Sequence, residues 1–227
     1  MIISAGGLSA EVFCRGGEAG DTPTVLLITG GESIRGIWEK YAALSDRPCR
    51  LAAVAVEDWE NALSPWRAGK VFKGGSDFGD GADGTAEMLE RELVPELRRA
   101  FDIKEGRFYI AGYSLAGLFA IYALYRTEVF SGAISASGSL WFPGFAEFTA
   151  AHEPLRRPNR MYFSLGDKEK NTKNPVMSRV EEKTKEISER FVEARIECVF
   201  RSEPGGHFAD AEGRIARGMA WLTDDRE

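Results

Sequence analysis

The amino-acid sequence predicts an α/β fold, in which helices cover a mostly parallel central sheet. The first observation is that short apolar runs alternate with amphipathic stretches along the chain. The second is that these runs are continuously apolar, as in strands that are buried on both faces of a sheet. With 227 residues, the chain has the length of one domain with a sizeable core. We therefore expect residues 1–227 to form a single domain.

Apolar runs of strand length follow a first, N-terminal strand. They lie at residues 24–29 (TVLLIT), 51–56 (LAAVAV), 107–111 (RFYIA), 132–135 (GAIS), 160–165 (RMYFSL) and 195–201 (RIECVFR). The segments between several of them are amphipathic, which is the arrangement expected of parallel strands joined by helices.

Three of the helices can be read from their apolar stripes. The first stripe repeats at four-residue spacing, at Leu89, Leu93, Leu97 and Phe101. Pro95 falls inside this helix and should bend it, because proline lacks the backbone N–H. A second helix should begin at Asn174–Pro175, an N-cap residue followed by proline at the first helical position. The last helix carries its stripe at Ile215, Met219 and Leu222.

Composition and charge exclude several classes of function. The net charge of −6 argues against a nucleic-acid or anionic-membrane partner, because both require a basic face. No apolar run approaches the roughly 18 residues of a membrane span, and the N-terminal segment lacks the features of a signal peptide. The three cysteines form no CxxC pair, so that neither a metal site nor a disulfide framework is indicated. We expect a cytoplasmic protein that needs no metal and no cofactor.

One connection, residues 58–84, is unusually long and has no clear period. It is rich in glycine and contains Trp59, Trp66 and Phe78. Loops of this length in compact domains are commonly functional, and we expect this one to lie over the active site. The alternative is a structural loop that packs on the surface.

Residues 112–117 (GYSLAG) carry the central motif. Ser114 directly follows a predicted strand and directly precedes an apolar helical segment, LFAIYALYR. A serine on such a tight turn projects its hydroxyl above the sheet edge, and small neighbours are needed to avoid a clash. The strict pattern is G-x-S-x-G, and here Ala116 stands at the last position. We interpret Ser114 as a nucleophile, the alternative being a buried serine that caps an ordinary helix.

An oxyanion hole should lie beside this serine. The backbone N–H of Leu115, at the start of the helix, points to the position where a carbonyl oxygen would become negative. A second donor is expected from the loop after an earlier strand, here residues 29–32 (TGGE). We select the N–H of Gly31, followed by that of Glu32. A plain turn that ends the strand is the alternative.

His207 is the candidate base, since the chain has only two histidines and His152 lies in a polar, proline-flanked segment. His207 lies in a loop between the last strand and the last helix. The acid should follow the strand at 160–165, where Asp167 and Glu169 both occur. Spacing alone does not choose between these two carboxylates, and either could be an ordinary solvated charge.

Four segments resemble the putative esterase family, which includes esterase D, feruloyl esterases and enterochelin-type esterases. They are the serine motif at 112–117 (GYSLAG), residues 137–142 (SGSLWF), the acid loop at 166–169 (GDKE) and the histidine loop at 205–207 (GGH). Residues 61–66 (NALSPW) resemble a segment of the same family more weakly. The resemblance implies an α/β-hydrolase fold with no separate cap domain, and it favours Glu169 as the acid. Ala116 and Gly138 depart from the family pattern.

These observations predict a serine hydrolase that cleaves a carboxylic ester through an acyl-enzyme. Ser114 would attack the acyl carbonyl, His207 would take its proton and Glu169 would orient His207. A thioesterase or acyltransferase would use the same residues. A hydrolase fold that only binds a ligand is the alternative from a different class.

The substrate should be a small-molecule ester that carries an aromatic or bulky apolar group. Trp141 follows a strand at its carboxyl end, the edge where open α/β sheets bind ligands. The long connection should bring Trp66 or Trp59 to the same edge. We therefore expect Trp141 and Trp66 to line a substrate pocket, the alternative being that they pack the loops onto the sheet.

Overall fold

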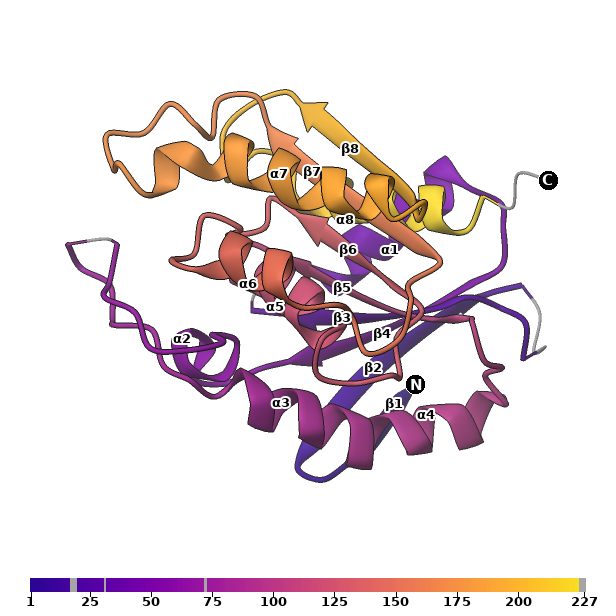
Figure 1. Ribbon diagram of the computed structural model, residues 1–227. Coiled ribbons are helices and arrows are strands. Elements are labelled where there is room, and N and C mark those ends of the chain that lie inside the picture. The colour runs from indigo at the N-terminus through magenta and orange to yellow at the C-terminus, as the bar shows by residue number, and fades with distance from the viewer. Residues whose placement is uncertain (17–19, 31, 72, 225–227) are drawn as a thin grey trace.

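An eight-stranded sheet forms the centre of the computed structural model, which describes residues 1–16, 20–30, 32–71 and 73–224 (Figure 1). Its strands, in the order in which they lie side by side, are β1 (Ile2–Ala5), β2 (Leu8–Arg15), β4 (Cys49–Ala55), β3 (Thr24–Thr29), β5 (Phe108–Tyr113), β6 (Gly132–Ala136), β7 (Arg160–Gly166) and β8 (Glu197–Glu203). The first two strands pair antiparallel, and β3 to β8 run parallel. The predicted mostly parallel sheet is confirmed.

Strand β3 begins and ends where the sequence predicts, and the other strands shift by one or two residues. Strand β8 shifts by two residues at both ends: it was expected to begin at Arg195 and begins at Glu197. Arg195 has a φ of 57°, which belongs to the left-handed region. It therefore completes the turn that leaves the preceding helix, and the strand starts after it.

Helices cover both faces of the sheet (Figure 1). Helices α1 (Ile34–Leu44) and α8 (Ala211–Leu222) pack on one face, where Ile37 and Met219 share a core cluster with Leu27 of β3. A second core cluster lies on the other face of the sheet, between the strands and five helices. These are α3 (Ala82–Met88), α4 (Val94–Phe101), α5 (Leu115–Ala123), α6 (Phe145–Ala151) and α7 (Val180–Glu193). Every residue of α5 is buried, as expected of a helix that is apolar on all sides. None of the helices in the described ranges is both long and apolar enough to cross a membrane.

The local signals at two helices act, but the second predicted helix begins later than Asn174–Pro175, since α7 begins at Val180. The Asn174 side chain accepts hydrogen bonds from the N–H groups of Val176 and Met177, and a short 3₁₀ turn then leads into α7. Pro95 lies in the first turn of α4, directly after a π-helical turn at Leu89–Leu93. The wider turn accommodates the proline ring and its missing N–H. The predicted irregularity therefore takes the form of a π turn.

The long connection forms a short helix, α2 (Trp59–Ala62), and an antiparallel bridge between Ala68 and Phe78. It starts from the carboxyl end of β4 and returns to α3. Its residues lie beside those that follow β5, so that it covers the carboxyl edge of the parallel strands. Residues of this connection line the cavity beside Ser114 that is described below.

Candidate active site

The turn between β5 and α5 holds Ser114 in a strained conformation, with φ 57° and ψ −121°. The turn is so tight that a Cβ at position 112 would lie 2.2 Å from the carbonyl oxygen of Ala116. The same added Cβ would lie 2.6 Å from the Ala116 methyl group, which therefore occupies space that Gly112 leaves open. Alanine is accommodated at this position of the motif because glycine stands opposite it.

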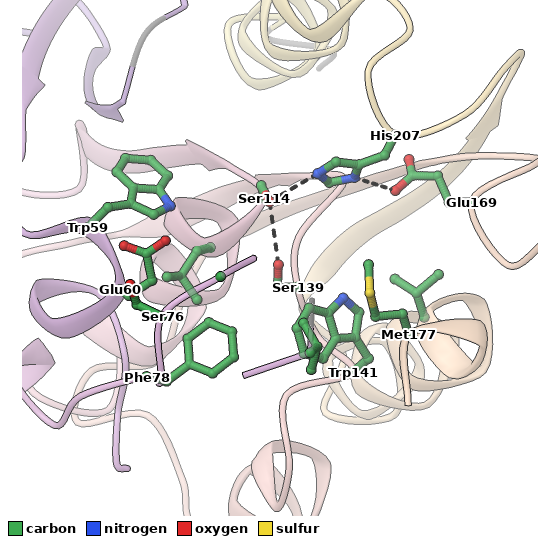
Figure 2. A pocket seen from close by; sticks show the side chains of 14 residues that line it. Trp59, Glu60, Ser76, Phe78, Ser114, Ser139, Trp141, Glu169, Met177 and His207 are labelled. Atoms are coloured by element: carbon green, nitrogen blue, oxygen red, sulfur yellow. Dashed lines mark hydrogen bonds and ion pairs between the residues drawn. The ribbon is translucent and has the colours of Figure 1, made fainter. Parts of the chain in front are cut away.

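A continuous line of hydrogen bonds joins Ser114, His207 and Glu169 (Figure 2). The His207 Nε2 atom lies 3.0 Å from Ser114 Oγ, and Nδ1 lies 2.7 Å from Glu169 Oε2. Asp167, the other carboxylate that the sequence offered, bonds a backbone N–H of the histidine loop instead. Its Oδ1 accepts a hydrogen bond of 2.8 Å from the N–H of Gly205 and so anchors the histidine loop. The structure therefore places Glu169, and not Asp167, where a triad acid belongs.

Glu169 is fixed through its second oxygen. Oε1 accepts hydrogen bonds of 2.7 Å from the N–H of Gly166 and from Nη1 of Arg214, which leaves Oε2 for His207. Burial by itself would raise the pKa of Glu169, but the hydrogen bonds from His207 and Gly166 outweigh it and hold that pKa below its usual value. The ionised carboxylate accepts the Nδ1 proton, so that Nε2 is free to accept the serine proton.

Arg214 contacts this site and is a residue that the sequence analysis missed. Its side chain is fully buried, and Nη1 also donates to Ser137 Oγ at 2.6 Å and to the Tyr113 hydroxyl at 3.3 Å. Nη2 donates to two carbonyl oxygens of the histidine loop, those of Pro204 and Gly206. An arginine next to the apolar stripe of an amphipathic helix is normally exposed, so the pattern gave no signal for it.

Tyr113 also contacts His207. Its hydroxyl donates to the backbone carbonyl of His207, and its ring centroid lies 5.4 Å from that of the imidazole. Burial raises the pKa of Tyr113, which keeps the hydroxyl protonated and able to donate. Hydrogen bonds with Asp167, Arg214 and Tyr113 therefore all fix the loop that carries His207.

The first predicted oxyanion donor, Leu115, is the first residue of α5 and lines the cavity beside Ser114. An N–H at this position of a helix has no acceptor within the helix and can bind an anion. The second predicted donor, Gly31, lies outside the described residues. Next to it, the Glu32 carboxylate accepts hydrogen bonds from the Thr29 hydroxyl and the Gly30 N–H. The donor role of Gly31 stays a prediction.

A cavity of about 130 Å³ opens beside Ser114. Its apolar wall includes Trp59 and Phe78 from the long connection and Trp141 from the loop after β6. Figure 2 shows Trp59 and Phe78 on one side of the cavity and Trp141 on the other. The Trp141 and Phe78 rings meet edge to face, with centroids 6.2 Å apart. Trp141 thus lines the cavity, as predicted, while it is 9% exposed.

The prediction that Trp66 lines the pocket is wrong for this cavity. Trp66 packs against the rings of Phe142, Phe145 and Phe148, and its Nε1 donates to the carbonyl oxygen of Pro143 at 2.9 Å. These contacts tie the long connection to α6. Trp59, and not Trp66, lines the cavity. Its indole ring packs against Gly30, because a Cβ added at Gly30 would lie 2.5 Å from the ring.

Comparisons with known proteins match this chain to a protein family. Residues 20–211 match the profile of the family described as Putative esterase. The uncharacterized protein YbbA of Bacillus subtilis is 25% identical over 187 residues, which are 78% of this chain and 73% of YbbA. The ferri-bacillibactin esterase BesA of the same species is 29% identical over 118 residues, which are 49% of this chain and 39% of BesA.

A solved structure shares the fold over nearly the whole chain. The IroE-like serine hydrolase from Shewanella oneidensis superposes with a TM-score of 0.77 at 15% sequence identity. The superposition covers 95% of this chain and 75% of that protein. The α/β-hydrolase fold that the sequence predicts is thereby confirmed.

Proposed function

This chain belongs to the Putative esterase family, and we propose that it hydrolyses a small carboxylic ester through Ser114, His207 and Glu169. Membership of the family makes it a carboxylic ester hydrolase. The observation that carries the proposed roles is the line of hydrogen bonds from Ser114 Oγ through the imidazole to Glu169. It provides a nucleophile, a base and a group that orients the base.

The proposed reaction has two halves. Ser114 Oγ attacks the acyl carbonyl while His207 Nε2 takes its proton, and the N–H groups of Leu115 and Gly31 bind the oxygen that becomes negative. His207 then returns the proton to the leaving alcohol, and an acyl-enzyme remains on Ser114. Water, activated by His207, attacks this ester and releases the acid. Glu169 keeps Nδ1 protonated in both halves.

The proposed substrate is a small ester with one aromatic or bulky apolar group. The volume of the cavity is close to that of an apolar cavity that holds one benzene-sized ring, roughly 150 Å³. Three aromatic side chains form its wall. BesA is named for ferri-bacillibactin, but the match covers 39% of BesA. We therefore take ester cleavage from this relative, and not its substrate.

We propose that residues 1–227 act as one domain in the cytoplasm. The elements from β1 to α8 contribute to one sheet and to the helices that cover it. All three cysteines are free thiols, which suits a reducing compartment.

A fluorophosphonate probe, which reacts with activated serines, tests the proposal together with a panel of p-nitrophenyl esters. The wild-type protein should be labelled and should hydrolyse the esters, and Ser114→Ala should lose both properties. Ser139→Ala is the matched control, because Ser139 Oγ lies 3.5 Å from Ser114 Oγ and is the nearby hydroxyl that could be labelled instead. Labelling that survives Ser114→Ala and disappears in Ser139→Ala would reject the assignment.

A further inference from the structure

An unpaired carboxylate lines the cavity. Glu60 is the second residue of α2, and its side chain is half-buried. Figure 2 shows it on the same side as Trp59 and Phe78, across the cavity from Trp141. Within the described ranges, the Glu60 carboxylate forms no hydrogen bond and no ion pair, and only its backbone carbonyl is engaged, by Ser64 and Gly79. The backbone of Glu60 is therefore fixed while its charge is free to meet a ligand.

The other charges around the cavity do not neutralise Glu60. The second carboxylate of the lining is Glu169, and both of its oxygens are already bonded to His207, Gly166 and Arg214. No lysine or arginine is found among the described residues that line the cavity. A ligand in this cavity consequently meets a negative potential on the side of Glu60, which disfavours a carboxylate or phosphate there.

Aromatic rings accompany this carboxylate. Trp59, Phe78 and Trp141 line the same cavity, and the face of such a ring attracts a cation, tryptophan most strongly. An organic ammonium group satisfies both features, since its charge pairs with Glu60 and its alkyl substituents lie against the rings. A neutral apolar group satisfies only the rings and leaves the half-buried carboxylate without a partner.

From these contacts we propose that the substrate is an ester that carries an organic ammonium group, and that Glu60 determines this specificity. The inference rests on the proposed esterase function and adds the charge class of the substrate. Glu60 binds the cation at a distance from the reacting carbonyl, so its contribution is to substrate binding and not to proton transfer.

Two pairs of isosteric esters test the proposal. For the acyl side, p-nitrophenyl 4-(trimethylammonio)butanoate is compared with p-nitrophenyl 5,5-dimethylhexanoate, in which a carbon replaces the charged nitrogen. For the alcohol side, choline butanoate is compared with 3,3-dimethylbutyl butanoate. In at least one pair, the wild type should prefer the cationic ester by about tenfold in kcat/KM. The preference should decrease only modestly as the salt concentration rises, because salt screens a half-buried pair less than an exposed one.

Glu60→Gln removes the charge and keeps the size of the side chain. The preference should fall about fivefold, to about twofold, because the charge that pairs with the ammonium group is gone. Intrinsic differences in the reactivity of the esters cancel, because the ratio is compared between proteins. Glu57→Gln is the matched control, since this exposed acid lies three residues away, outside the cavity lining, and its substitution changes the net charge equally. It should leave the preference unchanged.

The outcomes separate this inference from the proposed function. Hydrolysis of the neutral esters that depends on Ser114, with no cationic preference in either pair, would overturn the inference and leave the esterase function intact. A preference that persists in Glu60→Gln, or that falls equally in Glu57→Gln, would also overturn the role of Glu60. Loss of the Ser114 dependence would instead reject the proposed function.

Discussion

Two carboxylates follow β7, and only Glu169 meets the imidazole of His207. Glu169→Gln should lower kcat by a factor of about 10²–10⁴, because an amide neither holds the required tautomer nor stabilises the imidazolium that forms. Asp167→Asn, the matched control in the same loop, should lower kcat far less, since Asp167 bonds a backbone N–H. Steady-state kinetics on one p-nitrophenyl ester would measure both. The reverse ranking would transfer the role of the acid to Asp167.

The buried Arg214 should contribute to stability as well as to positioning. Arg214→Met should reduce the free energy of unfolding by about 3–5 kcal/mol, because it leaves buried acceptors and the Glu169 carboxylate without their partner. Denaturant unfolding would measure the loss. Arg91→Met is the control, because Arg91 pairs with Glu87 on the exposed surface and should cost no more than about 1 kcal/mol. Equal losses in the two variants would contradict the role assigned to Arg214.

At the scale of the elements, the turn between β5 and α5 was predictable, and the long connection only partly. The segment GYSLAG has a strand before it and an apolar helix after it, so its residue types define its geometry. The connection at 58–84 has no period, and its sequence therefore does not say which of its aromatic side chains faces the sheet edge. Trp59 was offered beside Trp66, and only the packing of Trp66 against α6 separates the two.

The two tryptophans should respond differently to truncation. Trp66→Ala should lower the free energy of unfolding by about 2–3 kcal/mol, since Trp66 packs among three phenylalanine rings, and should affect all esters alike. Trp141→Ala should raise KM for aromatic esters more than for acetyl esters, because Trp141 lines the cavity. Thermal unfolding and kinetics on both ester classes would measure these effects. A selective rise in KM in Trp66→Ala would place Trp66 in the substrate pocket.

At the scale of the whole molecule, the proposed triad unites three distant segments. Ser114, Glu169 and His207 follow β5, β7 and β8, and parallel strands bring their carboxyl ends to one edge of the sheet. The sequence could predict this convergence because it depends on strand order and direction alone. It could not predict Arg214 or Tyr113, whose roles depend on how α8 and β5 pack beside the histidine loop.

The central claim is that ester cleavage proceeds through an acyl group on Ser114, and rapid-mixing kinetics test it most directly. A p-nitrophenyl ester whose acyl-enzyme breaks down slowly should release a burst of p-nitrophenol that approaches one equivalent per protein molecule. Acid quenching during the burst, followed by peptide mass spectrometry, should place the acyl group on the peptide that contains Ser114. An acyl group on another residue, or turnover that persists in Ser114→Ala with its burst intact, would contradict the account.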